Sequence, residues 1–130
     1  MQYRTYKETM LPQMVRLWKE EAVRIRYKAY DSPEEWKAEL LDKPDFDPEG
    51  CILAFTDSGS LAGFAAAISQ KEFLPGQNRD NTPGYIFLLV VKEEYEGRGV
   101  GSSLLEKAEA FLKDQGKHEI RISHKCPIKM

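Results

Sequence analysis

Residues 85–111, YIFLLVVKEEYEGRGVGSSLLEKAEAF, decide the fold of this chain. The stretch opens with a continuous apolar run from Tyr85 to Val91, which is typical of a strand buried on both faces. Glycine then occupies three alternate positions, Gly97, Gly99 and Gly101. After the glycines, apolar residues recur at i, i+1, i+4, i+7 and i+8, the spacing of a helix with one buried face: Leu104, Leu105, Ala108, Phe111 and Leu112. The stretch therefore predicts a buried strand, a glycine loop and an amphipathic helix, in that order.

The residues that follow extend this unit. Gly116 is expected to end the helix, and His118–Ser123 (HEIRIS) reads as a final strand. Strand, helix and strand in this order predict a parallel pair joined by a right-handed crossover. Upstream, two apolar strands flank the turn Asp57–Ser60, which predicts an antiparallel hairpin. The fold class is mixed α/β, an α+β arrangement built around a mixed sheet.

Two helices are expected before the hairpin. After a short strand in YRTYK, a helix starting at Thr9 would place a series of apolar residues roughly on one face: Met10, Met14, Leu17, Trp18, Val23 and Ile25. A second helix starts at DSPEEW, capped by Asp31 or Ser32 with Pro33 in its first turn, and ends near Lys43.

Composition limits the functional classes. The chain has 130 residues, enough for one domain with a real core, and 42% of them are apolar while 31% are charged. A net charge of −2 gives no general attraction to nucleic acid or to an anionic membrane, so neither is expected as a partner. The first ten residues lack the apolar core of a signal peptide, which predicts a cytoplasmic protein. Cys51 and Cys126 are far apart in the sequence, so we expect two reduced thiols and no metal site.

A glycine loop between a buried strand and a helix favours an anion site. The first amides of a helix have no internal acceptor and lie at the positive end of its dipole, and glycines let them approach a phosphate closely. The alternative is a tight turn with no ligand. The spacing matches neither the phosphate-binding motif GxxxxGK[ST] nor the dinucleotide motif GxGxxG, because no lysine follows Gly101 and Ser102 or Leu104 stands where the third glycine belongs.

The stretch LVVKEEYEGRGVGSSLL resembles the coenzyme signature of the GNAT superfamily of N-acetyltransferases, Q/R-x-x-G-x-G/A after a strand of the type L-x-V. The resemblance implies acetyl-coenzyme A as co-substrate, no metal, and transfer of the acetyl group to an amine. Its pantetheine arm would pair with the main chain of Leu89 and Val91, and its pyrophosphate would lie on the amides from Gly97 to Ser102. The implied coenzyme-binding residues are Leu89, Val90, Val91, Gly97, Arg98, Gly99, Val100, Gly101 and Ser102. Arg98 would contact a phosphate or remain in solvent, and the Ser102 hydroxyl would contact the coenzyme or cap the helix.

The chain departs from the family pattern at several points. Glu96 stands where the family has Gln or Arg, and Phe87 stands where many members have a glutamate base. The sequence stops soon after the HEIRIS strand, so the implied fold lacks the family's C-terminal helix and strands, including a tyrosine that often protonates the leaving thiolate. Residues 1–130 are therefore expected to form one GNAT-like domain truncated on its C-terminal side.

No catalytic residue is assigned from the sequence. His124 lies near the end of the last strand and His118 at its beginning, but a lone histidine is more often structural or solvated. Tyr27, Tyr30 and Trp36 would line an acceptor pocket or belong to the core.

The leading hypothesis is an enzyme that acetylates a small-molecule or protein amine. The alternatives are a non-catalytic acetyl-coenzyme A-binding module and the N-terminal half of a two-domain acetyltransferase. An apolar edge at the last strand predicts either a homodimer or association with a missing C-terminal domain.

Overall fold

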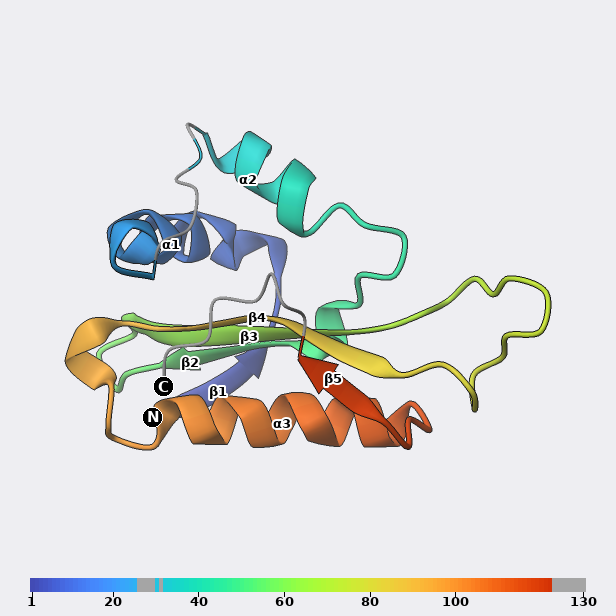
Figure 1. Cartoon of the computed structure of the whole chain (residues 1–130). Helices are drawn as coiled ribbons and strands as arrows, with labels where there is room; N and C mark the ends of the chain where they lie inside the picture. Colours follow the sequence, from blue (N-terminus) through green and yellow to red (C-terminus); the bar gives the residue numbers. More distant parts are fainter. Residues whose placement is uncertain (26–29, 31, 123–130) are drawn as a thin grey trace.

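The computed structural model describes residues 1–25, 30 and 32–122 of the chain. Its centre is a five-stranded sheet in the order β1-β2-β3-β4-β5 (Figure 1). The strands are β1 (Gln2–Thr5), β2 (Cys51–Phe55), β3 (Leu61–Ser69), β4 (Gly84–Val91) and β5 (Ile120–Ile122). Neighbouring strands are antiparallel except β4 and β5, which are parallel. The predicted hairpin and the predicted parallel pair are both confirmed, and Ser123, which was expected to end the last strand, lies outside the described residues.

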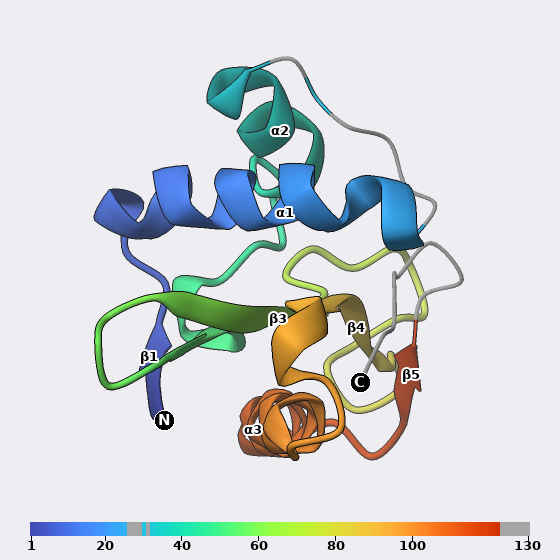
Figure 2. The same cartoon turned by 90° about the vertical axis from the view of Figure 1, so that its left-hand side faces the viewer.

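The helices cover the sheet on both faces. The helices α1 (Leu11–Ile25) and α2 (Pro33–Leu40) lie over one face, and α3 (Val100–Asp114) lies along the other (Figures 1 and 2). Three short 3-10 turns complete the order: η1 (Glu8–Met10), η2 (Pro48–Gly50) and η3 (Glu93–Tyr95). Since η3 and the glycines stand between β4 and α3, they form the connection that crosses from the sheet to its second face.

The second helix begins as expected and ends earlier. The Ser32 hydroxyl caps α2 by accepting a hydrogen bond from the Glu35 amide at 3.1 Å, and Pro33 follows at the first position. The helix ends at Leu40 and not at Lys43, because the chain turns there to bury Leu41. Its last turn closes on one carbonyl, that of Lys37, which accepts the amides of residues 41 and 42.

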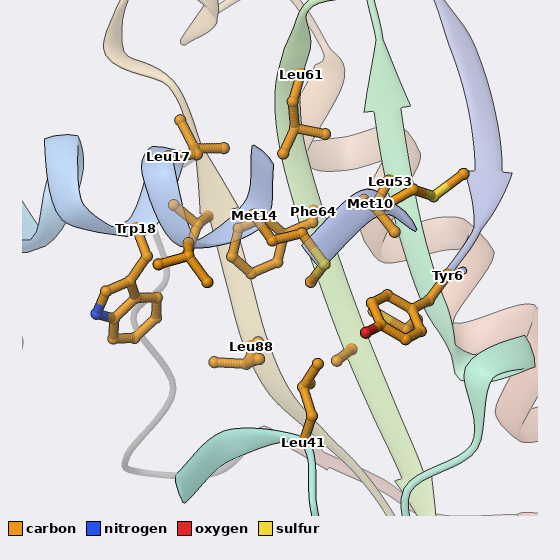
Figure 3. Close-up of a cluster of buried hydrophobic side chains, with 14 of the residues drawn as sticks. Tyr6, Met10, Met14, Leu17, Trp18, Leu41, Leu53, Leu61, Phe64 and Leu88 are labelled. Carbon is orange, nitrogen blue, oxygen red and sulfur yellow. The ribbon is translucent and has the colours of Figure 1, made fainter. Parts of the chain in front are cut away.

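The core on the α1 and α2 face is built from large side chains (Figure 3). Trp36 is fully buried and packs edge-on against Phe64 of β3 and Trp18 of α1, with ring centroids 6.1 Å and 5.9 Å away. Figure 3 shows Met14 of α1 beside Phe64, with Leu88 of β4 in the same cluster. Fully burying an aromatic or aliphatic side chain of this size stabilises the fold by about 1.5–3 kcal/mol.

The α3 face uses small residues, so helix and sheet approach closely. Its cluster combines alanines of β2 and β3 with the predicted apolar stripe of α3, in which Leu104, Ala108 and Leu112 are buried. At Gly84, the first residue of β4, a Cβ atom would lie only 2.7 Å from the Cδ2 atom of Leu112. A side chain at position 84 would therefore fit only if the Leu112 side chain moved.

A bulge interrupts the pairing of β4 with β3. Ala66 pairs with Leu88 while the next residue, Ala67, pairs with Ile86, so Phe87 is an extra residue on β4. Phe87 and Leu88 consequently both pack toward the α1 and α2 face, whereas Ile86 and Leu89 belong to the α3 face. Such bulges bend a strand and increase its twist. The pairing of β4 with β5 covers Gly84 to Ile86, the part of β4 before the bulge.

Candidate functional site

In the second half of β4, the main-chain groups of alternate residues point away from β3. The Lys92 amide donates to the Ala62 carbonyl at 2.8 Å, so Lys92 and every second residue before it, Val90 and Leu88, point their main-chain groups at β3. The amide and carbonyl of Leu89 and Val91 therefore point to the β5 side of the strand. They lie beyond Ile86, where the described pairing with β5 ends.

The side chains of this segment are all buried. Leu89 and Val91 pack under α3, and Val90 packs toward α1 and α2, each without solvent exposure. A ligand beside this part of β4 would therefore contact main chain and not side chains.

The glycine loop changes direction at two of its three glycines. Gly97 has φ 76° and Gly99 has φ 83°, both in the left-handed region that side chains disfavour. A Cβ atom at either position would meet nothing within 4 Å, so the space beside both residues is open. Gly101 is a buried residue in the first turn of α3, where the backbone is right-handed helical.

The start of α3 presents a run of amides without protein acceptors. Gly99 is the N-cap, and the first helical hydrogen bond runs from the Ser103 amide to the Gly99 carbonyl at 3.0 Å. In the described part of the chain, the amides from Gly97 to Ser102 donate to no protein atom. They lie at the positive end of a 15-residue helix. Ser102 does not cap the helix, since it is the third helical residue and its side chain is exposed.

Charged side chains surround this loop. Arg98 is exposed, and its guanidinium carbon lies 5.9 Å from the ring centroid of Tyr95. The ammonium of Lys92 lies 3.0 Å from a Glu94 carboxylate oxygen and 3.9 Å from one of Glu20, and the hydrogen bond to Glu94 raises the pKa of Lys92. Glu96, the departure from the family pattern, is half-buried. Arg98 therefore supplies an exposed positive charge at the loop, whereas Lys92 is paired with carboxylates.

A buried lysine holds the opposite end of β4. The Lys117 ammonium donates to the Arg79 carbonyl at 3.0 Å, the Thr82 carbonyl at 3.1 Å and the Thr82 hydroxyl at 2.8 Å. Burial, and then the nearby charge of Arg79, lower the pKa of Lys117. Lys117 follows Gly116, which ends the helix with φ 80° as expected. It thus ties the loop that precedes β4 to the segment that precedes β5.

The other sequence candidates lie away from the glycine loop or outside the description. Trp36 is a core residue, and the half-buried Tyr30 lies 6.5 Å from the Trp18 ring. Exposed His118 precedes β5, at the opposite end of the sheet from the loop. Two further candidates, Tyr27 and His124, lie outside the described residues, as do Cys126 and the side chains of Val23 and Ile25.

Three further observations concern a buried thiol, metal ions and membranes. The Cys51 thiol is free and buried, and burial raises its pKa to about 12, so it is not a nucleophile at neutral pH. Within residues 1–25, 30 and 32–122, no three His, Cys, Asp or Glu side chains gather in a way that suits a metal ion. The same residues contain no helix with the length and hydropathy needed to cross a membrane.

One residue near the site was missed in the sequence. Glu21 of α1 is 5% exposed, and its carboxylate accepts a hydrogen bond from the Glu93 amide at 3.0 Å. The signal was present, because Glu21 lies seven residues after Met14 and three after Trp18, on the buried stripe of α1. A glutamate on an apolar stripe indicates a specific buried partner.

Comparison with known proteins assigns the family. The sequence pattern of the acetyltransferase (GNAT) family matches residues 11–126. The chain belongs to the GNAT acetyltransferase family. Among curated proteins, the mycothiol acetyltransferase of Paenarthrobacter aurescens (strain TC1) is 32% identical over 77 residues, which are 59% of this chain and 23% of that protein. The mycothiol acetyltransferase of Arthrobacter sp. (strain FB24) is 31% identical over 75 residues, 58% of this chain and 22% of that protein. This GNAT chain spans less than a quarter of the length of these relatives.

Solved structures share the fold. The aminoglycoside acetyltransferase AAC(6')-Iy, in complex with the bisubstrate analogue CoA-S-monomethyl-acetylneamine, superposes with a TM-score of 0.68 at 19% identity, covering 94% of this chain and 78% of that one. The aminoglycoside 6'-N-acetyltransferase AAC(6')-IG of Acinetobacter haemolyticus gives a TM-score of 0.65 at 19% identity, with 95% and 79% covered. The GNAT fold is therefore shown for this chain by structure as well as by sequence.

Proposed function

We propose that this GNAT chain is an N-acetyltransferase that binds acetyl-coenzyme A along β4 and at the start of α3, and transfers its acetyl group to an amine. The observation that carries the proposal is the run of amides from Gly97 to Ser102, which have no acceptor among the described residues and adjoin open space at Gly97 and Gly99. A pyrophosphate has the charge and the oxygen atoms that such amides bind.

Different groups of the chain would bind different parts of the co-substrate. Main-chain groups of Leu89 and Val91 would bind the pantetheine arm as an added strand, and the buried side chains of Val90 and Val100 would keep the strand and the helix start in place. The amides of Gly97, Arg98, Gly99, Val100, Gly101 and Ser102 would bind the pyrophosphate. The Arg98 side chain would add a charge-assisted contact to a phosphate. The thioester supplies an acetyl group activated for attack by a neutral amine.

The acceptor is proposed to be a small-molecule amine. Support comes from the names of the similar proteins, which are mycothiol and aminoglycoside acetyltransferases. No catalytic residue is proposed. His118 lies at the end of the sheet remote from the glycine loop, and His124 lies outside the described residues. We place the activity in the cytoplasm, where a free thiol such as Cys51 stays reduced.

Two further expectations remain proposals. One is that residues 1–130 belong to a single GNAT-like domain. The other is that the edge strand β5, where Ile122 is 49% exposed, is covered by a second copy of the chain or by another domain. Light scattering of the purified chain tests for the second copy.

Calorimetric titration of acetyl-coenzyme A into the purified chain tests the proposal directly. A second assay follows release of free coenzyme A thiol with a panel of aminoglycosides, aminosugars and an acetylatable peptide. Binding together with amine-dependent thiol release supports an acetyltransferase. Binding without release for any acceptor identifies a non-catalytic module. No binding at millimolar acetyl-coenzyme A refutes the proposal.

A further inference from the structure

The helix α1 contacts the junction between β4 and the glycine loop through two consecutive residues. The carboxylate of Glu21 accepts the Glu93 amide at 3.0 Å, although 72 residues separate them in the chain. The carboxylate of Glu20 lies 3.9 Å from the Lys92 ammonium. In Figure 2, the orange turn between β4 and α3 lies directly beneath α1. One helix on the first face of the sheet thus contacts the segment that leads to the second face.

The burial of Glu21 needs an explanation. A carboxylate with 5% exposure carries a large desolvation cost unless it is hydrogen-bonded. The hydrogen bond from the Glu93 amide offsets part of this cost. Glu93 is the first residue of η3, and the N-cap residue of this turn is Lys92, whose side chain has no acceptor with which to cap it. Glu21 supplies from α1 the cap that the local sequence lacks.

Fixing Glu93 also fixes the start of the glycine loop. The turn closes with the Tyr95 amide on the Lys92 carbonyl at 2.9 Å and the Glu96 amide on the Glu93 carbonyl at 3.1 Å. Gly97 follows this closed turn immediately, so the position of the Glu93 amide determines where the loop leaves the sheet. We propose that Glu21 is a positioning residue for the co-substrate: through the Glu93 amide it holds the glycine loop in the orientation that binds pyrophosphate. This inference rests on the proposed function.

The experiment compares four proteins in calorimetric titrations with coenzyme A: native, Glu21→Leu, Glu21→Gln and Met14→Ala. Leucine keeps the volume of Glu21 and removes the acceptor, whereas the glutamine amide oxygen still accepts the Glu93 amide. Met14→Ala is the matched control, because Met14 lies two turns earlier on the same buried stripe and its truncation destabilises the fold without touching η3. Hydrogen exchange of the amides from Gly97 to Ser102 is measured on the same samples.

Glu21→Leu should weaken coenzyme A binding at least tenfold and speed exchange of the loop amides, while Glu21→Gln stays within threefold of native. Met14→Ala should change neither quantity, even where its melting temperature is as low as that of Glu21→Leu. In turnover assays, the KM for acetyl-coenzyme A should rise in Glu21→Leu and the KM for the amine should not. Coenzyme A affinity within twofold of native in a folded Glu21→Leu protein would overturn the inference. Failure of the native chain to bind coenzyme A is a different result, and it refutes the proposed function itself.

Discussion

Replacing Gly99 by alanine separates the strain of the glycine loop from its proposed role in binding. Gly99 has φ 83°, and a Cβ atom there meets no atom within 4 Å, so alanine adds backbone strain and no clash. A non-glycine residue in the left-handed region costs roughly 1–2 kcal/mol. For a chain of 130 residues, an unfolding entropy of about 2.1 cal/mol/K per residue converts this cost into a melting temperature about 4–7 °C lower.

The same substitution should have a larger effect on the co-substrate. The new methyl group would occupy open space beside the amides of the loop, where the pyrophosphate is proposed to lie. Coenzyme A affinity should therefore fall more than tenfold, which corresponds to more than about 1.4 kcal/mol at 25 °C. Thermal unfolding and calorimetric titration of the same samples measure the two effects separately.

Gly59 provides a matched control. Its φ is 87° and its surroundings are equally empty, but it lies in the hairpin turn between β2 and β3. Gly59→Ala should lower the melting temperature as much as Gly99→Ala and leave coenzyme A affinity unchanged. Equal losses of stability with native affinity in both variants would refute the reasoning, because the glycine loop would then be only a turn.

Three further predictions follow from side chains described above. Arg98→Ala should weaken coenzyme A binding about tenfold at low salt and less at 0.5 M salt. Stability should stay unchanged, because the exposed Arg98 guanidinium lies over the Tyr95 ring and is paired with no carboxylate of the described residues; titrations at two ionic strengths measure the effect on binding. Lys117→Met should lower the free energy of unfolding by roughly 2–4 kcal/mol in urea denaturation, since the carbonyl and hydroxyl oxygens of Thr82 and the carbonyl oxygen of Arg79 lose a charged donor; a loss below 1 kcal/mol would contradict the structure. Ionisation of Cys51 should lower the free energy of unfolding as pH rises from about 9 toward about 12, by up to about 1.4 kcal/mol per pH unit, because the thiol stays protonated in the folded chain and ionises in the unfolded chain. Cys51→Ala should remove this contribution to the pH dependence, which urea denaturation at pH 8, 9.5 and 10.5 measures.

The sequence predicted the order of elements because the chain marks them strongly. The apolar run of β4, the hairpin turn and the cap at Ser32 each have a local physical cause, and all three appear in the structure. The parallel pairing of β4 with β5 followed from connectivity alone. Motif and strand together also indicated the GNAT family, which the family comparison confirms.

The features that shape the site were not predictable in the same way. The bulge at Phe87 lies within a continuous apolar run. Apolar and polar residues do not alternate there, so the sequence does not show which face of the sheet each side chain occupies. The sequence contains three glycines but does not reveal which of them adopt a positive φ, and Gly101 proved to be helical. The position of Glu21 on the apolar stripe of α1 was visible in the sequence, but the Glu93 amide was not identifiable as a partner, because 72 residues separate the two in the chain.

The close contact between Gly84 and Leu112 has a consequence for how this protein can vary. It fixes the carboxyl end of α3 against the sheet, while the amino end of the same helix carries the amides of the glycine loop. A helix of this length measures about 22 Å, so if the Leu112 side chain does not make room for a larger residue at position 84, displacement of this end of α3 would redirect those amides. In a genetic screen for weakened coenzyme affinity, substitutions at Gly84 would be recovered beside those at Gly99, and compensating changes would appear at Leu112. Lineages that drift in sequence would have to change these two distant positions together.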